Sequence, residues 1–183
     1  MKILAIVGSL RAESLNRQLA GLAASAVGSR AEFEILEFGG VPLFNQELEY
    51  PAPEVVAAVR QKVLQADGVW FFTPEYNHSY PGVLKNLIDW LSRPRGEDEP
   101  QVLFGKPAAI SGITPGMSGT GLAQDHLVTL LSFLNMRIMN TPRLVIPSAM
   151  TQVTDGKLTL TESAEFLRIQ ADAFVSFVGG RAR

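Results

Sequence analysis

Short apolar runs alternate along this chain with longer segments of helical spacing, and this alternation constrains the fold most strongly. The run at 3–7 contains no polar residue, which is typical of a strand that is buried on both faces. Shorter or less regular runs of the same kind follow at 33–38, 69–73, 107–111, 136–139 and 144–146. Strands that alternate with helices in this way build a parallel sheet with helices on both faces.

Helical stripes separate these runs. Apolar residues recur three or four positions apart over 84–91 and 127–134, more loosely over 56–63 after Pro53, and again over 166–177. The dipeptide Asp67-Gly68 predicts the end of a helix directly before the third strand, because glycine often terminates helices. The order of elements is therefore a repeated strand–helix unit.

Five strands in 183 residues fit the flavodoxin-like order 2-1-3-4-5 better than the six-stranded dinucleotide-binding order. We therefore expect a three-layer α/β sandwich. No repeat or low-complexity tract divides the chain, so we expect one domain over residues 1–183. The polar segments 45–53 and 93–101 indicate surface loops, and the second is either a solvated loop or one that closes over a ligand.

The composition excludes several kinds of chemistry. The chain has no cysteine and two histidines, so it has no thiol nucleophile, no cysteine-ligated cluster and no three-histidine metal site. A net charge of −2 argues against nucleic-acid and membrane partners. The apolar N-terminal run is too short for a signal peptide, and no run of about 18 apolar residues could span a bilayer. We expect a cytoplasmic protein.

Polar groups crowd the loop after the first strand. Ser9, Arg11, Ser14 and Asn16 follow Gly8 closely and lead into a helix. A helix start offers unpaired backbone N–H groups and a positive dipole end, and an arginine adds forked, charge-assisted hydrogen bonds. This set of donors predicts a phosphate-binding site, although a capped helix beside a surface arginine would show the same residue types. The loop is not a Walker loop, because the pattern G-x-x-x-x-G-K-[ST] is absent, and it is not the dinucleotide-binding motif G-x-G-x-x-G.

The loop after the third strand begins with a proline that restricts its backbone, and polar and aromatic residues follow. Pro74 opens it, and Glu75, Tyr76, Asn77 and His78 follow. A planar heteroaromatic ring would find hydrogen-bond partners along such a backbone and an aromatic neighbour in Tyr76. Tyr76 could instead be a partly buried core residue, and His78 alone is more typical of a solvated loop.

The loop after the fourth strand, 111–121, holds four glycines, which allow a ligand to approach the backbone closely. Residues 116–120 nearly match the nucleophile elbow of serine hydrolases, but Thr120 stands at the last glycine position. His126 lies on the following helix, where we expect a helix-flank or subunit-contact residue rather than a catalytic base.

Two blocks of motifs carry a family resemblance. Gly8-Ser9-Leu10-Arg11 with Ser14 and Asn16 forms the first, and Pro74-Glu75-Tyr76-Asn77, followed by 81–86 and Asp89-Trp90, forms the second. Together they resemble the NADPH-dependent FMN reductase family and, within it, bacterial quinone and chromate reductases.

The resemblance implies noncovalent FMN, reduced by NADPH or NADH and reoxidised by a quinone or another small acceptor. No catalytic side chain and no metal are needed, since the cofactor supplies the redox chemistry. It also implies a homodimer or homotetramer. The implied FMN-binding residues are Ser9, Arg11, Ser14 and Asn16 for the phosphate, Pro74, Glu75, Tyr76 and Asn77 for the ring, and Ser111 with Gly112 nearby.

Three other interpretations remain open from the residues alone. A flavodoxin-like electron carrier would share the fold and FMN, but such carriers are usually strongly acidic, unlike this chain. A protein of this fold could also bind another phosphorylated ligand. A serine hydrolase is the weakest alternative, because the elbow is incomplete.

Overall fold

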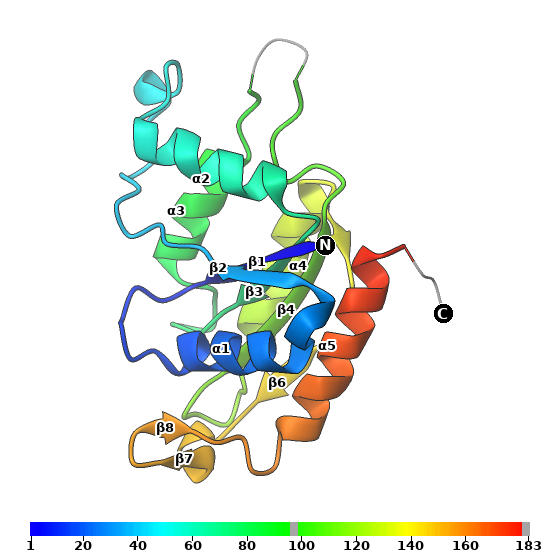
Figure 1. The fold of residues 1–183 in the computed structure, drawn as a ribbon. Coiled ribbons are helices and arrows are strands. Elements are labelled where there is room, and N and C mark those ends of the chain that lie inside the picture. Colours follow the sequence, from blue (N-terminus) through cyan, green and yellow to red (C-terminus); the bar gives the residue numbers. More distant parts are fainter. Residues whose placement is uncertain (96–98, 181–183) are drawn as a thin grey trace.

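The computed structural model describes residues 1–95 and 99–180, and its centre is a parallel sheet (Figure 1). The strand order is β2-β1-β3-β4-β5, and β6 pairs with β4 as well. This order confirms the predicted flavodoxin-like α/β fold. The strands are β1 (Lys2–Val7), β2 (Glu32–Ile35), β3 (Gly68–Phe72), β4 (Pro107–Ile113), β5 (Arg137–Ile138) and β6 (Leu144–Ile146).

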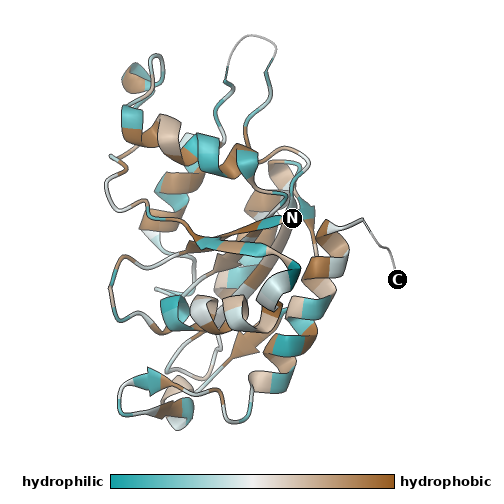
Figure 2. Cartoon of the chain, in the orientation of Figure 1, coloured by the Kyte–Doolittle hydropathy of each residue, from teal (hydrophilic) through white to brown (hydrophobic). Residues whose placement is uncertain are grey.

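Helices cover both faces of the sheet. One apolar cluster joins the sheet to α1 (Leu15–Val27) and α5 (Ala164–Val178). The other joins it to α2 (Glu54–Gln65), α3 (Gly82–Leu91) and α4 (Gly121–Phe133). In Figure 2 the central strands are largely hydrophobic, while α2 and α5 show alternating hydrophobic and hydrophilic surfaces. None of the helices in the described ranges is long and apolar enough to cross a lipid bilayer.

The first strand shows why its sequence contains no polar residue. Ile3 and Ala5 point to the cluster under α1 and α5, whereas Leu4 and Ile6 point to the opposite cluster. All four side chains are fully buried. Alternate side chains point to opposite faces of a strand, so a strand covered by helices on both sides must be apolar throughout.

The last part of the sheet differs from a simple fifth strand. The predicted runs 136–139 and 144–146 form separate strands, and both pair with β4, at Pro107–Ala108 and at Ser111–Ile113. A small hairpin, β7 (Val153–Thr154) and β8 (Lys157–Leu158), was not predicted. It is attached to α1 through the Gln18 side chain, whose Oε1 accepts from the Leu158 N–H at 2.8 Å.

Gly68 has a different role from the predicted helix stop. Helix α2 ends at Gln65, and Gly68 is the first residue of β3. A Cβ at Gly68 would lie 2.6 Å from Cγ2 of Val178 on α5. The absence of a side chain therefore lets α5 pack directly on the sheet.

The two predicted surface loops meet each other. Segment 45–53 contains a short 3₁₀ turn, η2 (Gln46–Leu48), and the buried Glu49. The Glu49 carboxylate accepts a hydrogen bond from Arg93 Nε at 2.8 Å. Of the second segment, 93–101, residues 96–98 lie outside the described residues. The contact holds 45–53 against the end of α3.

Candidate cofactor site

The start of α1 leaves backbone donors unpaired. Ser14 is the N-cap in an extended conformation, and the first intrahelical bond runs from the Gln18 N–H to the Ser14 carbonyl at 3.0 Å. The N–H groups of Leu15, Asn16 and Arg17 therefore have no partner within the helix. They face the carboxyl end of the sheet together with the positive end of the helix dipole.

Three side chains complete this donor set. The Ser14 side chain makes no capping hydrogen bond, although the residue is almost fully buried. The Ser9 hydroxyl accepts only a long bond from the Arg11 N–H, at 3.4 Å. Arg11 itself is exposed and forms no ion pair with any carboxylate in the described part of the chain. An anion can thus recruit both hydroxyls and the guanidinium without breaking an existing ion pair.

Gly8 brings the first loop against the second. Its φ is not in the left-handed region, so tight turning is not the reason for glycine here. A Cβ at Gly8 would lie 3.2 Å from Pro74 Cδ and 3.5 Å from Pro81 Cδ. Gly8 therefore allows the loop after β1 to touch both prolines that bound the loop after β3.

The second loop is a tight two-residue turn. Tyr76 and Ser79 exchange two backbone hydrogen bonds, of 2.9 and 3.1 Å. Asn77 and His78 between them both adopt left-handed conformations, with φ of 53° and 61°. This is the pattern of a type I′ turn. Neither the Asn77 nor the His78 N–H donates to another residue of the described ranges, so both are available to a ligand.

Glu75 ties this turn to the next helix. Its side chain is only 6% exposed, and Oε2 accepts from the Ala123 N–H in the first turn of α4 at 3.1 Å. The other oxygen, Oε1, lies 3.6 Å from Nδ1 of the exposed His78. A carboxylate at a helix N-terminus is stabilised by the unpaired N–H groups there. Glu75 thus fixes the position of the turn relative to α4.

A cavity of about 190 Å³ lies where these loops meet. Residues from both loops line it, and the end of β4 closes it. The structure therefore brings together predicted site residues that are about 60 positions apart in the sequence. Those that line the cavity are Ser9, Arg11, Ser14, Asn16, Pro74, Glu75 and Tyr76.

Asn16 lines the cavity, but its side chain is already engaged. Nδ2 donates to the Ile113 carbonyl at 2.9 Å, and Oδ1 accepts from the Ile113 N–H at 3.1 Å. The amide thereby joins the start of α1 to the end of β4. What Asn16 offers a ligand is its backbone N–H, while its side chain positions the loop.

Three predicted site residues do not line the cavity: Asn77, Ser111 and Gly112. Asn77 is exposed in the turn after β3, whereas Ser111 and Gly112 lie within β4, and Ser111 is fully buried. Its hydroxyl accepts from Trp70 Nε1 at 2.8 Å and donates to Gln170 Oε1 at 2.6 Å. A Cβ at Gly112 would lie 2.5 Å from the Thr73 carbonyl oxygen and closer still to Thr120. Ser111 and Gly112 serve packing inside the sheet.

Thr114 and Pro115 line the cavity instead, and they were not predicted as site residues. The predicted strand ended at residue 111, whereas β4 continues to Ile113. The residues that line the cavity are therefore the first ones after the observed end of the strand, not the predicted ones. The polar Thr114 directly before Pro115 could have indicated from the sequence that the strand ends there.

The near match to a nucleophile elbow has no catalytic geometry. His126 Nδ1 lies 3.3 Å from the Ser79 hydroxyl. Within the described residues, no hydrogen bond joins His126 to Ser118, the serine of the elbow. The contact instead connects α4 to the turn after β3.

The fold and this cavity define a flavodoxin-like α/β protein whose cavity, with the unpaired donors of a helix start, lies at the switch point of strand order. A family model described as "NADPH-dependent FMN reductase" matches residues 1–151. The chain belongs to this family. Membership of this family confirms the predicted FMN cofactor and NAD(P)H electron donor.

Relatives cover nearly the whole chain. It is 39% identical over 182 residues to a 2-hydroxy-1,4-benzoquinone reductase of Burkholderia sp., covering 99% of this chain and 98% of that protein. It is 38% identical over 180 residues to an NAD(P)H-dependent FMN reductase of Pseudomonas aeruginosa, covering 97% and 95%. The solved structure of FerB, a flavoenzyme NAD(P)H:(acceptor) oxidoreductase of Paracoccus denitrificans, superposes with a TM-score of 0.87 at 37% identity, covering 98% of each chain.

Proposed function

We propose that this protein binds FMN in the cavity between the first two loops, oxidises NAD(P)H and reduces a small quinone. The observation that carries the proposal is the donor set around the start of α1. It combines the N–H groups of Leu15, Asn16 and Arg17 with the side chains of Ser9, Arg11 and Ser14. A phosphate with two negative charges fits this set, because each of these groups can donate a hydrogen bond. The carboxylate of Glu75 lines the same cavity but accepts from the Ala123 N–H of α4.

The turn after β3 serves the flavin ring in this proposal. Pro74 and Tyr76 form the cavity wall opposite the helix start, and Asn77 and His78 present unpaired N–H groups. When bound, FMN supplies the redox chemistry, and the protein supplies position and electrostatics. Backbone donors at the polar edge of the ring favour the reduced form, which carries more negative charge.

The acceptor, the assembly and the location complete the proposal. A quinone acceptor is supported by the names of the similar reductases. A homodimer or homotetramer is supported by α4, where Leu122 and Phe133 are exposed, Phe133 by 81%. A cytoplasmic location fits the use of NAD(P)H as donor, and we propose that residues 1–183 act as one domain.

A visible spectrum of the purified protein followed by anaerobic addition of NADPH tests this function. We expect a flavin spectrum that bleaches with NADPH alone and returns when a quinone is added. A flavin that stays oxidised until a partner enzyme is supplied would identify an electron carrier instead. A protein that is colourless and stays so with added FMN would point to another phosphorylated ligand.

A further inference from the structure

Glu75 places a buried carboxylate in the wall of the smaller cavity. Its side chain is 6% exposed, close to the 5% of Glu49, but the two carboxylates have different partners. Glu49 is paired with Arg93 at 2.8 Å, whereas no lysine or arginine of the described residues forms an ion pair with Glu75. Glu75 is therefore a buried acidic group without a strong countercharge.

The contacts of Glu75 satisfy its oxygens but do not balance its charge. Oε2 accepts from the Ala123 N–H at the start of α4, and Oε1 lies 3.6 Å from Nδ1 of His78, whose side chain is 79% exposed. A backbone N–H carries only a partial charge, and an imidazole balances a carboxylate only when it is protonated. With a neutral imidazole, the cavity wall keeps a negative charge.

Such an arrangement normally costs stability. A carboxylate that leaves water is usually paired with a close countercharge, because hydrogen bonds alone do not repay the loss of hydration. Exceptions to this rule are expected at functional sites, where a residue serves the ligand rather than the fold. The position of Glu75 in the wall of the proposed FMN site agrees with this expectation.

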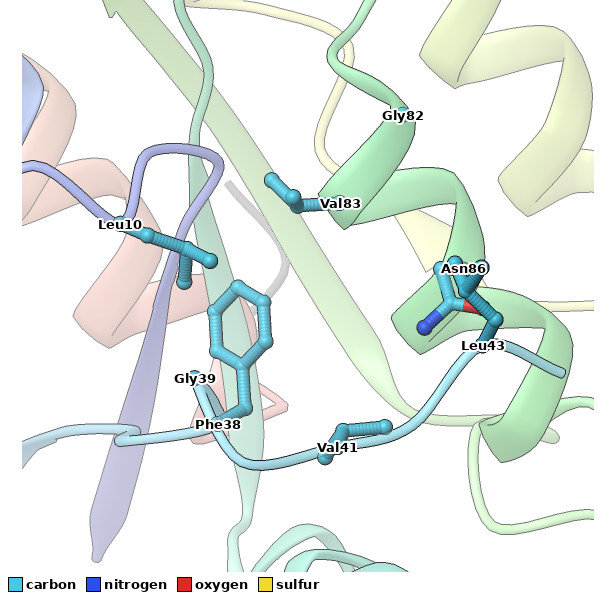
Figure 3. Close-up of a pocket in the computed structure, with 8 residues that line it drawn as sticks. All are labelled: Leu10, Phe38, Gly39, Val41, Leu43, Gly82, Val83 and Asn86. Atoms are coloured by element: carbon cyan, nitrogen blue, oxygen red, sulfur yellow. The ribbon is translucent and has the colours of Figure 1, made fainter.

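The neighbouring cavity on the other side of the first loop has no such charge. Its volume is about 410 Å³, and three segments line it, with Leu10 from the first loop, Phe38 from the chain after β2 and Val83 from the start of α3. Figure 3 shows these three side chains pointing toward one another. None of the residues that line this cavity is charged. Of these two cavities, only the one assigned to FMN has a carboxylate in its wall.

Glu75 lies on the side of the cavity that we assign to the flavin ring. Its neighbours in the chain, Pro74 and Tyr76, form the wall opposite the start of α1, where the phosphate donors are. A flavin ring becomes more negative on reduction, so a negative charge beside it disfavours the reduced form. The same charge acts less on the phosphate, which is farther away on the opposite wall.

We propose that the Glu75 carboxylate lowers the reduction potential of the bound cofactor by opposing the negative charge of the reduced ring. The proposal rests on the proposed function for the position of FMN. On the same turn, the unpaired N–H groups of Asn77 and His78 favour the reduced form, and Glu75 counteracts them. The residue thereby keeps the reduced protein a stronger reductant toward its acceptor.

The test is a spectroelectrochemical titration of the protein, as purified with its FMN, at about pH 8, above the range in which histidine usually changes charge. Glu75→Gln removes the charge, but its amide oxygen can still accept from the Ala123 N–H. Glu75→Asp keeps the charge on a shorter side chain. Glu47→Gln is the matched control, since Glu47 is exposed and lines neither cavity.

We expect Glu75→Gln to shift the equilibrium toward the reduced form by about tenfold, which is a rise of about 30 mV in the midpoint potential of a two-electron couple. Glu75→Asp should stay closer to the wild type than to Glu75→Gln, and the control should equal the wild type. Because binding and reduction are linked, Glu75→Gln should also favour reduced over oxidised FMN by the same factor in the ratio of their Kd values.

A wild-type potential in Glu75→Gln would overturn the proposal. So would a Glu75→Asp variant that shifts as far as Glu75→Gln, because the side chain would then act through its shape. Tighter binding of oxidised and reduced FMN alike in Glu75→Gln would mean that the carboxylate acts on the phosphate, which also contradicts the proposal. A wild type without a flavin spectrum would overturn the proposed function as well, whereas the electrode titration works even if NADPH does not reduce the protein.

Discussion

The loop after β1 and the segment at the end of β4 both combine glycine with hydroxyl side chains, but the fold uses them in opposite ways. After β1, Ser14 makes no capping bond and Ser9 makes only one long hydrogen bond, so their hydroxyls remain available. At the end of β4, the Ser111 hydroxyl bonds Trp70 and Gln170. The Thr120 hydroxyl likewise accepts from Gln124 Nε2 at 3.1 Å.

The difference follows from where each hydroxyl stands relative to the end of its strand. Ser9 and Ser14 come after β1 has ended and lie outside the sheet. Ser111 is still within β4, two residues before its end, and points into the apolar cluster under α1 and α5. Similar residue types are therefore available to a ligand in one place and satisfy buried partners in the other. Stability and FMN binding should respond separately to changes in these two regions.

The largest effect is expected from Gly112→Ala. The added methyl group would overlap the Thr73 carbonyl and the Thr120 side chain, and we expect a loss of about 3 kcal/mol in unfolding free energy. Urea denaturation measures it. Gly21→Ala on α1 is the control, because no atom lies within 4 Å of its Cβ position, and alanine there should stabilise by about 1 kcal/mol. Equal midpoints for both variants would contradict the packing role.

Asn16→Ala should affect both regions at once. It leaves the Ile113 N–H and carbonyl without their partners, and we expect a loss of about 2 kcal/mol in stability, together with weaker FMN binding. Denaturation and FMN titration report the two effects. Ser25→Ala on the exposed face of α1 should change neither. A variant with full stability and weak FMN binding would mean that the Asn16 amide contacts the cofactor directly.

Ser111→Ala should lower stability by about 1 kcal/mol, since Trp70 Nε1 and Gln170 Oε1 lose a shared partner. Its Kd for FMN should equal that of the wild type. The comparison with Ser14→Ala is informative, because that variant should show the reverse: normal stability and weaker FMN binding. If Ser111→Ala binds FMN poorly while remaining stable, Ser111 belongs to the cofactor site as the sequence predicted.

The smallest effect is expected at Glu34 on β2, which lines neither cavity. Hydrogen bonds from Lys2, at 2.7 Å, and Lys62, at 2.5 Å, lower the pKa of this carboxyl below its ordinary value of 4.5. Its stabilisation is therefore present above that pH and is lost as the pH falls through the lowered pKa. Glu34→Gln should cost less than about 1 kcal/mol near neutral pH and nothing in strong acid. Denaturation midpoints at both pH values check this, and FMN binding should not change.

The sequence predicted the fold and most of the cavity because both depend on local patterns. Apolar runs without alternation predicted β1 and β3, and the crowding of polar groups after Gly8 pointed to the loop that lines the smaller cavity. The strand order then placed the loops after β1 and β3 at the same edge of the sheet. Tyr76 and Arg11 could be brought together on that basis alone.

The wrong predictions depend on contacts between residues that are far apart in the sequence, and a local pattern does not reveal such contacts. The end of β4 was set two residues early, because Gly112 looks like a loop residue until its contact with Thr120 is known. Gly68 looked like a helix stop for a similar reason, since only the packed α5 shows why a side chain is excluded there. The apolar cavity around Val83 combines three distant segments, none of which is unusual by itself.

The most direct test of the account compares the Kd values for FMN and for riboflavin, which lacks the phosphate, in the wild type and in Arg11→Ala. If the first loop binds the phosphate, the variant should bind FMN more weakly by about 1.5–3 kcal/mol, the range for hydrogen bonds to a charged group. Riboflavin should bind both proteins equally. An Arg11→Ala variant that binds FMN as the wild type does, or loses FMN and riboflavin to the same extent, would contradict the assignment of this loop to the phosphate.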